Sequence, residues 1–473
     1  MLGKESERVC LTPQSSAFAK KTGLPSVYFA VSLLSIFLIP FIVRHFSEIN
    51  LPPLKAPARF FITALYLNLA ASYFLYLKSE ASQGLLGKRE WGIFFIFAAL
   101  LCLAPPVFSG DLMECLIRGR IFAVYHLNPY QHVPEEFPND LLSSYSIWRD
   151  VPHTYGPLLA YLQALPVMLF PNSVSGMIWA QKMILLFFYG VTVLFFAKIV
   201  RLTGPEAPAN ALPAFALNPL LVVCTVLDGH NDIVMLCFTV VSLWCLLRGR
   251  FTLCFLFWSC AFLAKYTVVL LLPLLVVYAV KREASRHGSF PWAFIFKQAA
   301  LNLLFIAAVF APIWNGKETF IVLLQVSEWF YTNTIPYAAH QLLGLLNLNV
   351  SQHFVKNFFL AGFGVFYVWA LAVFIKKDEM GHREFFGWLA CIYLCFFTTL
   401  TSPLAAHYFL WALPWLILAR PPAANFFITL YSFTALFSYF KRMNYLILIA
   451  AAVYLAVLAF GGRGFIFWKR KAG

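Results

Sequence analysis

Three short polar segments carry the side chains of this sequence that could do chemistry. They are SGDLMECLIRGR at 109–120, WRDVPHTYGP at 148–157 and LDGHND at 227–232. The first segment places Asp111 directly after an apolar run. A carboxylate at such a boundary can serve as a general base, and cations beside it can hold a phosphate group. We therefore interpret Asp111 as a candidate base and Arg118 as a candidate phosphate ligand.

The first segment also has a simpler, structural interpretation. If 111–120 is helical, Glu114 and Arg118 lie on one face as an i, i+4 pair, whereas Arg120 points away. Exposed pairs of this kind are common and contribute little to stability. The sequence alone leaves the structural and the functional interpretation open.

The second segment is rich in residues typical of a membrane–water interface. Trp148 and Tyr155 suit an aromatic belt. The sequence Tyr155-Gly156-Pro157 breaks the chain before the next apolar run, 157–170. This pattern favours a belt followed by a helix start, with a ligand role for His153 as the alternative.

The third segment crowds Asp228, His230, Asn231 and Asp232 into one tight turn between two apolar runs. One polar side chain is enough to cap the next helix, and Asn231 is suited to that task. The other three exceed this structural need, so the pattern favours a functional loop. Asp228, His230 and Asp232 could hold a metal, but their spacing matches no strong ligand motif. We expect no metal and no other cofactor.

Lys265 stands alone between two apolar runs. Its side chain could reach the interface along apolar surface, or it could contact a phosphate group. Glu328, His340 and His407 lie in or beside later loops. Each of these three, taken alone, is interpreted as an ordinary loop or interface residue.

The elements that position these residues must be membrane helices. Of the 473 residues, 61% are hydrophobic and only 12% are charged, against about 25% charged residues in an average soluble domain. So few charges cannot cover the surface of a soluble protein of this size. The composition excludes a soluble enzyme, a nucleic-acid-binding module and a disordered protein, and the net charge of +15 is better explained by membrane topology.

The apolar runs predict an all-α polytopic bundle of about 13–14 transmembrane helices, because lipid cannot satisfy free backbone amides. The candidate spans are 27–43, 58–77, 91–108, 177–200, 207–226, 233–247, 251–264, 266–280, 298–313, 356–375, 385–401, 406–419, 423–438 and 444–460. The predicted organisation is a cytoplasmic tail at 1–26, one membrane domain at 27–460 and a basic cytoplasmic tail at 461–473.

Lysine and arginine residues predict the orientation, since they concentrate in cytoplasmic loops. With both termini inside and 157–170 re-entrant or lying on the surface, most of these residues fall on the cytoplasmic side. The polar loops then share the outer face: 109–155, 227–232, 314–340 and 402–405. We expect a multi-pass protein of the cell inner (plasma) membrane with its site facing outward.

In this order, the motifs resemble the GT-C superfold of membrane glycosyltransferases. The closer resemblance is to its polyprenyl-phosphate-mannose-dependent branch, the family-87 and mycobacterial α-1,6-mannosyltransferase type; GPI mannosyltransferase I of eukaryotes is more distantly similar. The resemblance covers roughly residues 90–290. The residues that carry it are Asp111 with GR at 119–120, NPY at 128–130, YGPL at 155–158, NPL at 218–220, DGHND at 228–232 and AKYT at 264–267. One departure is that three spans precede Asp111 where the simplest members have one.

The resemblance implies an inverting hexosyltransferase, with mannose as the expected sugar. Its donor would be a polyprenyl-phosphate sugar and its acceptor a lipid-linked glycan, a surface glycan or a glycolipid; membrane lipids are further partners, and nucleic acid is not. Asp111 would be the catalytic base. The implied substrate-binding residues are Arg118, Arg120, Tyr130, His153, Tyr155, Asp228, His230, Asn231, Asp232 and Lys265.

Other functions also fit an apolar polytopic chain. A transporter or a lipid or glycan flippase would place polar sites near mid-membrane, often on broken helices, and Pro273, Pro312 and Pro414 lie within predicted spans. A glycan polymerase or ligase of another fold would carry a large outer loop late in the chain, whereas the largest one here is early. A non-catalytic membrane partner would have no use for four polar residues in one turn.

Overall fold

The protein is an all-α membrane protein. The computed structural model describes residues 24–46, 56–83, 87–320, 322, 334–377, 380–401, 404–421 and 423–439. The predicted tails, 1–26 and 461–473, lie outside these ranges apart from residues 24–26. The predicted span 444–460 and Glu328 also lie outside them.

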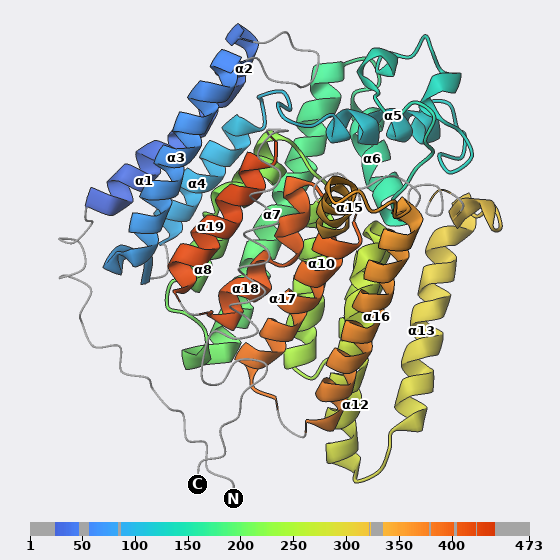
Figure 1. The fold of residues 1–473 in the computed structure, drawn as a ribbon. Helices are drawn as coiled ribbons and strands as arrows, with labels where there is room; N and C mark the ends of the chain where they lie inside the picture. Colours follow the sequence, from blue (N-terminus) through green and yellow to red (C-terminus); the bar gives the residue numbers. More distant parts are fainter. Residues whose placement is uncertain are drawn as a thin grey trace, which may run out of the picture.

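The N-terminal helices form a layer on one flank of the bundle (Figure 1). This layer contains α1 (Leu24–Leu34), α2 (Leu38–Phe46), α3 (Ala56–Lys78) and α4 (Lys88–Leu101). The α3 helix packs against α1, α2 and α19 (Ala424–Phe437). These contacts join the N-terminal layer to the C-terminal part of the bundle.

The remaining helices alternate in direction and bury a large apolar core. They are α7 (Val174–Thr203), α8 (Ala211–Ala216), α9 (Pro219–Leu221), α10 (Asp232–Leu247), α11 (Phe251–Ala264), α12 (Leu272–His287), α13 (Trp292–Phe310), α15 (Ile335–Leu345), α16 (Gln352–Lys376), α17 (His382–Thr399) and α18 (Leu413–Ala419). The largest fully buried side chains of the core include Trp388, Trp411 and Trp415. Burial of such side chains stabilises the packing between helices through close van der Waals contact.

The first outer loop contains two short helices at one end of the bundle. Figure 1 shows α5 (Asp111–Ala123) lying across the upper end, with α6 (Pro157–Leu169) close to it. The two helices pack closely because Gly119 has no side chain: a Cβ atom there would lie 2.3 Å from the Gln163 carbonyl oxygen. At 13 residues, α6 is shorter than the roughly 17 residues that a spanning helix needs.

The predicted spans coincide with helical regions in the part of the chain that the structure describes. Every predicted span except 444–460 overlaps helical structure. Among the described residues, five helices are long and apolar enough to cross a membrane: Leu24–His45, Ala56–Lys78, Val174–Glu206, Trp292–Ile313 and Gln352–Lys376. The other predicted spans are shorter, interrupted or less apolar. The structure thus confirms an all-α membrane protein with five candidate spans among the described residues, and the number of about 13–14 transmembrane helices stays a prediction.

One interrupted span leads directly into the second polar loop. The predicted run 207–226 divides into α8, α9 and a π-helical turn at Val222–Leu227. A π-turn inserts an extra residue per turn and often occurs at functional sites. Here it ends immediately before Asp228, and the amide N–H of His230 donates to the Cys224 carbonyl at 2.9 Å. The turn therefore sets the position of the residues 228–232.

Candidate active site

The two polar loops that are far apart in the sequence meet at Asp111. This residue begins α5, and its side chain is 30% exposed. The Nδ1 atom of His230, in the second loop, lies 3.2 Å from Asp111 Oδ2. His230 itself is buried. The contact leaves a reachable carboxylate beside a fixed imidazole, a geometry suited to moving a proton.

A third element, late in the chain, completes this cluster. His407 lies in the short helical segment Ala406–Trp411, and its ring stacks on His230 with centroids 3.9 Å apart. Its Nε2 atom is 4.0 Å from Asp111 Oδ2 and 3.9 Å from Asp232 Oδ2. The interpretation of His407 as an ordinary residue is therefore not supported. A histidine at the outer end of a predicted span is a weak signal of such a role, and nothing in the sequence connects that span to Asp111.

Burial and charge shift the pKa values of Asp111 and His230 in opposite directions. Burial alone would raise the pKa of Asp111, but the hydrogen bond with His230 and the charges of His230, His407 and Lys265 lower it well below its ordinary value. Burial alone would lower the pKa of His230, but the hydrogen bond and negative charge of Asp111 raise it. Both shifts favour an ionised Asp111 beside a protonated His230.

The same cluster could hold a divalent metal ion. Asp111, His230 and His407 each offer one ligand atom, and these atoms lie within 4.8 Å of one another. His230 Nε2 is also 3.1 Å from the Tyr439 hydroxyl, a contact that would orient a metal-binding imidazole. The same contact serves equally well to fix His230 against Asp111.

Lys265 forms a second charged centre next to this cluster. Its Nζ atom donates to Asp232 Oδ1 at 2.6 Å, and the Trp411 Nε1–H donates to the same oxygen at 2.5 Å. The ammonium also lies 5.1–5.2 Å from the ring centroids of Tyr155, Tyr408 and Trp411. Such cation–π contacts and the ion pair stabilise a positive charge that is only 8% exposed.

A glycine allows the second polar segment to reach Lys265. The amide of Gly156 donates to the Ala264 carbonyl at 3.1 Å. A Cβ atom at Gly156 would lie 2.1 Å from the Leu263 carbonyl oxygen. Only glycine permits this approach, which brings Tyr155 to the side of Lys265. The close approach of the two segments thus explains the glycine of the YGPL motif.

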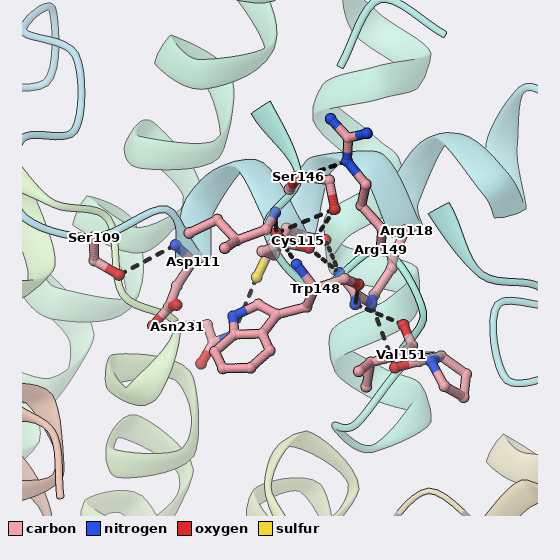
Figure 2. A network of polar contacts seen from close by, with 12 residues as sticks. Ser109, Asp111, Cys115, Arg118, Ser146, Trp148, Arg149, Val151 and Asn231 are labelled. Atoms are coloured by element: carbon pink, nitrogen blue, oxygen red, sulfur yellow. Dashed lines mark hydrogen bonds and ion pairs between the residues drawn. The ribbon is translucent and has the colours of Figure 1, made fainter. Parts of the chain in front are cut away.

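Arg118, which Figure 2 shows beside Trp148 and Val151, holds the first outer loop in place together with Glu114. Arg118 donates to the Glu114 carboxylate at 2.6 Å and to the carbonyl oxygens of Glu114, Trp148, Val151 and Pro152. Glu114 in turn accepts from Ser146 and from the amides of Ile147 and Trp148. These contacts use the donors of the Arg118 guanidinium within the loop, so the structure does not support the prediction that Arg118 binds a phosphate group.

Three more of the predicted substrate-binding residues also make internal contacts. Arg120 donates to Asp140 at 2.7 Å and to the Pro171 carbonyl, and the Tyr130 hydroxyl donates to the Tyr155 carbonyl. His153 is fully buried, and burial followed by the Arg118 charge lowers its pKa to about 3. A neutral, buried imidazole cannot stabilise a phosphate charge. Arg120 and Tyr130 therefore use donors within the loop, whereas His153 packs its ring against Tyr130 and Tyr155, and its ring nitrogens have no hydrogen-bond partner among the described residues.

The side chains of Asp228 and Lys182 connect the two polar loops by hydrogen bonds to backbone atoms. Asp228 is buried, and its Oδ1 accepts the amides of Val107 and Phe108 at 2.9 and 3.0 Å. Lys182, in the middle of α7, donates to the carbonyl oxygens of Ala104 and Leu227. Sequence analysis missed Lys182 because it interrupts a long apolar run without any nearby motif. Asp228 fixes the segment before Asp111 and does not face outward as a sugar ligand would.

This arrangement predicts different effects for two substitutions of Asp228. Asp228→Ala should destabilise the protein by about 2–4 kcal/mol, because two buried amides lose their acceptor. Asp228→Asn keeps an acceptor oxygen and should preserve most of the stability. Thermal unfolding of the purified variants measures both effects. Equal stability of the alanine variant and the wild type would show that Asp228 does not hold the loops together.

Asn231 contacts the first outer loop directly. Its Nδ2 donates to Cys115 Sγ at 3.3 Å, next to Asp111 in Figure 2. The structure records no side-chain cap at the start of α10, so the expected capping role of Asn231 is wrong. Asn231 instead joins the two polar loops on the side facing α5.

Comparison with known proteins gives similarity over the part of the chain that carries these loops. Residues 51–281 match a family described as α-(1→6)-mannopyranosyltransferase, N-terminal domain. A protein of Mycolicibacterium smegmatis named "Probable alpha-(1->6)-mannopyranosyltransferase" is 29% identical over 162 residues, 32% of this chain and 28% of that protein. An α-(1→6)-mannopyranosyltransferase of Mycobacterium tuberculosis is 30% identical over 156 residues, 32% of this chain and 26% of that protein.

The match covers only about a quarter of the length of these relatives. No solved structure matches the chain. The matched segment includes Asp111, the loop 228–232 and Lys265, whereas His407 lies outside it. Residues 51–281 are therefore similar to the N-terminal domain of the α-(1→6)-mannopyranosyltransferase family, which confirms the resemblance that the sequence motifs indicated.

Proposed function

We propose that this chain is a membrane hexosyltransferase that moves mannose from a polyprenyl-phosphate donor to a lipid-linked glycan, a surface glycan or a glycolipid. The observation that carries the proposal is the contact between Asp111 and His230, which joins the two acid-bearing loops into one partly exposed site. The names of the similar proteins support a mannosyl group. The apolar helices around the site support a lipid-linked donor.

The proposed reaction is a single displacement at the anomeric carbon. The acceptor hydroxyl oxygen attacks C1 while Asp111 takes its proton, and the bond between C1 and the phosphate oxygen breaks. The bonding electrons leave with the polyprenyl phosphate. Attack opposite the leaving group inverts the configuration at C1. The exposed carboxylate of Asp111, at the start of α5, supports its assignment as the base.

The departing phosphate needs positive charge beside it. We assign this task to His230 and Lys265, which contact Asp111 and Asp232; burial lowers the pKa of His407, so its imidazole is neutral and can only donate a hydrogen bond. Arg118 and Arg120 are not part of this assignment, since their donors are used within the first outer loop. This set of residues requires no metal ion for the proposed reaction.

Asp232, Asn231 and Tyr155 remain as proposed contacts for the sugar or acceptor. Asp232 Oδ2 is free of the Lys265 hydrogen bond and faces His407. Tyr155 lies against Lys265. These side chains line the same side of the cluster as Asp111, so a hexose bound there would meet both its base and its charge partners.

We further propose that the site faces the outer side of the inner membrane, with both termini in the cytoplasm. The loops that carry Asp111 and His230 lie at the same end as α5 (Figure 1). The cationic ends of α7, α12 and α16 lie at the opposite end. This separation of charge agrees with the rule that positive residues stay inside.

Lipid and glycan analysis of a strain that lacks the gene tests this function. We expect one envelope glycan or glycolipid to lose a hexose, and the wild-type gene to restore it. A flippase or transporter would instead leave the complete glycan on the wrong side of the membrane. Accumulation of a fully built glycan inside the cell would therefore contradict the proposal.

The opposing pKa shifts predict the pH dependence of transfer. Asp111 must be ionised, and its lowered pKa keeps it so until the pH falls well below about 4, the ordinary range of aspartate. His230 must be protonated, and its raised pKa extends activity above about 6.5, the ordinary histidine value. Activity should be lost as the pH rises through the raised pKa of His230.

His230→Asn provides the matched test of this pH dependence. Without the imidazolium, burial should raise the pKa of Asp111, so the acidic limit of activity should move to higher pH. Rates of transfer measured across pH in buffered vesicles give both limits. An acidic limit that is the same in the variant and the wild type would contradict the coupling of these two groups.

A further inference from the structure

A second polar region lies at the end of the bundle opposite α5, where α11 begins, α12 ends and α13 begins (Figure 1). A cavity of about 510 Å³ opens there, and its lining includes Arg250, Thr252, Glu283 and Lys297. These residues have no part in the proposed transfer reaction. The region needs a separate explanation.

An apolar cavity of about 940 Å³ adjoins this polar one between α11, α12 and α13. Aromatic and aliphatic side chains such as Trp258, Phe262 and Phe310 line it. Phe294 and Gln298 line both cavities. The two cavities therefore adjoin each other at these side chains, with a charged mouth on one side and an apolar interior of the kind that accepts hydrocarbon chains on the other.

The charge at the mouth is positive. Arg250 and Lys297 are exposed, and neither forms an ion pair within the part of the chain that the structure describes. The one acid in the lining, Glu283, is already paired with Arg286 at 2.6 Å and lies 3.5 Å from His287. Arg250 and Lys297 thus remain available to an anion.

Gln298 supplies a second, independent indication of a ligand. It is 7% exposed, and its Nε2 donates to Thr252 Oγ1 at 2.9 Å. Its Oε1 is buried and has no hydrogen-bond partner among the described residues. A buried acceptor of this kind is costly to leave unpaired. A hydroxyl group entering the mouth of the cavity would satisfy it.

We propose that these adjoining cavities bind an anionic glycerophospholipid of the bilayer. Its phosphate contacts Arg250 and Lys297, a headgroup hydroxyl donates to Gln298 Oε1, and its acyl chains occupy the apolar cavity. Basic pockets between membrane helices on the cytoplasmic side bind anionic headgroups in this manner, and the cationic end here is the one we assign to the cytoplasm. The proposal stands independently of the transferase function.

Native mass spectrometry of the full chain tests the proposal. Protein released from nanodiscs that contain equal amounts of phosphatidylglycerol and phosphatidylcholine should retain phosphatidylglycerol. The double variant Arg250→Gln/Lys297→Gln should retain at least about tenfold less phosphatidylglycerol than the wild type. Each cation near a membrane surface contributes several-fold to the binding of an anionic lipid. A control with the same charge change, Lys88→Gln/Arg201→Gln, should retain the wild-type amount.

A filled cavity provides the second arm of the test. Ala299 lines the apolar cavity, so Ala299→Trp should lower lipid retention by a similar factor without changing the charge. Equal retention of the two phospholipids would overturn the anionic headgroup. Preferential retention of added polyprenyl phosphate would also overturn the proposal, because the cavity would then bind the sugar donor's lipid and not a glycerophospholipid. Failure of sugar transfer in the same samples would leave this result unaffected, which keeps the two proposals distinguishable.

Discussion

Replacing Asp111 with asparagine should lower mannosyl transfer by about 10²–10⁴-fold, the usual contribution of a general base. Asparagine has nearly the same shape and keeps an oxygen that can accept from His230 Nδ1, so the protein should fold normally. It cannot take the acceptor proton. The measurement is the initial rate of transfer in vesicles at matched amounts of folded protein.

Asp150 provides the control for Asp111. It is exposed in the same outer loop, and the proposed reaction gives it no role. Asp150→Asn should therefore transfer at close to the wild-type rate. If Asp111→Asn also transfers at that rate, Asp111 is not the base.

Replacing Lys265 with methionine should destabilise the protein strongly. Asp232 is 1% exposed, and loss of its partner would leave a buried carboxylate without a compensating charge. Removal of one partner from a buried ion pair typically costs about 3–5 kcal/mol. The amount of folded protein and its unfolding temperature should both fall clearly below those of the wild type.

The double variant Asp232→Asn/Lys265→Met separates the structural from the functional role of Lys265. It contains no unpaired charge, and the asparagine oxygen can still accept from Trp411 Nε1, so most of the stability should return. Transfer should stay at least about 100-fold below the wild-type rate, because the phosphate loses a cation and the sugar loses a carboxylate. Recovery of both stability and transfer would assign Lys265 to packing alone.

The convergence of the two polar loops could be anticipated from the sequence, whereas the third element could not. Asp111 and His230 each follow an apolar run at the same predicted face, and the resemblance placed both in one site. His407 comes from a segment that no motif links to the other two. Its role depends on the packing of Ala406–Trp411 against the start of α10, a long-range contact that local sequence does not encode.

The arginines show why residue type alone misleads about binding. The sequence predicts Arg118 as a phosphate ligand because it is a cation near Asp111, and the family resemblance implies that Arg118 and Arg120 bind substrate. In the structure both are 6% exposed, and carbonyl oxygens and carboxylates of the same loop occupy them. Whether a cation serves a ligand or a loop depends on which acceptors surround it, and apart from Glu114 those acceptors come from residues 20–51 positions away in the chain.

The fold class followed from composition, but the lengths of the helices did not. Apolar runs located the helices because backbone amides in lipid must be paired within the segment. Proline and the π-turn at Val222–Leu227 then divided several runs into pieces too short to span. The π-turn packs against α4 and α7, and it leads directly into the residues 228–232 that the site uses.

Transfer by the purified chain in vesicles of defined lipid composition tests the central proposal most directly. Vesicles would receive polyprenyl-phosphate mannose or a nucleotide-linked mannose, with a glycolipid acceptor fraction and a metal chelator. The account predicts transfer from the polyprenyl donor alone, with one polyprenyl phosphate released for each mannose transferred. Transfer from the nucleotide-linked donor alone would contradict the proposed function. A failure to release polyprenyl phosphate when the acceptor is present would contradict it as well.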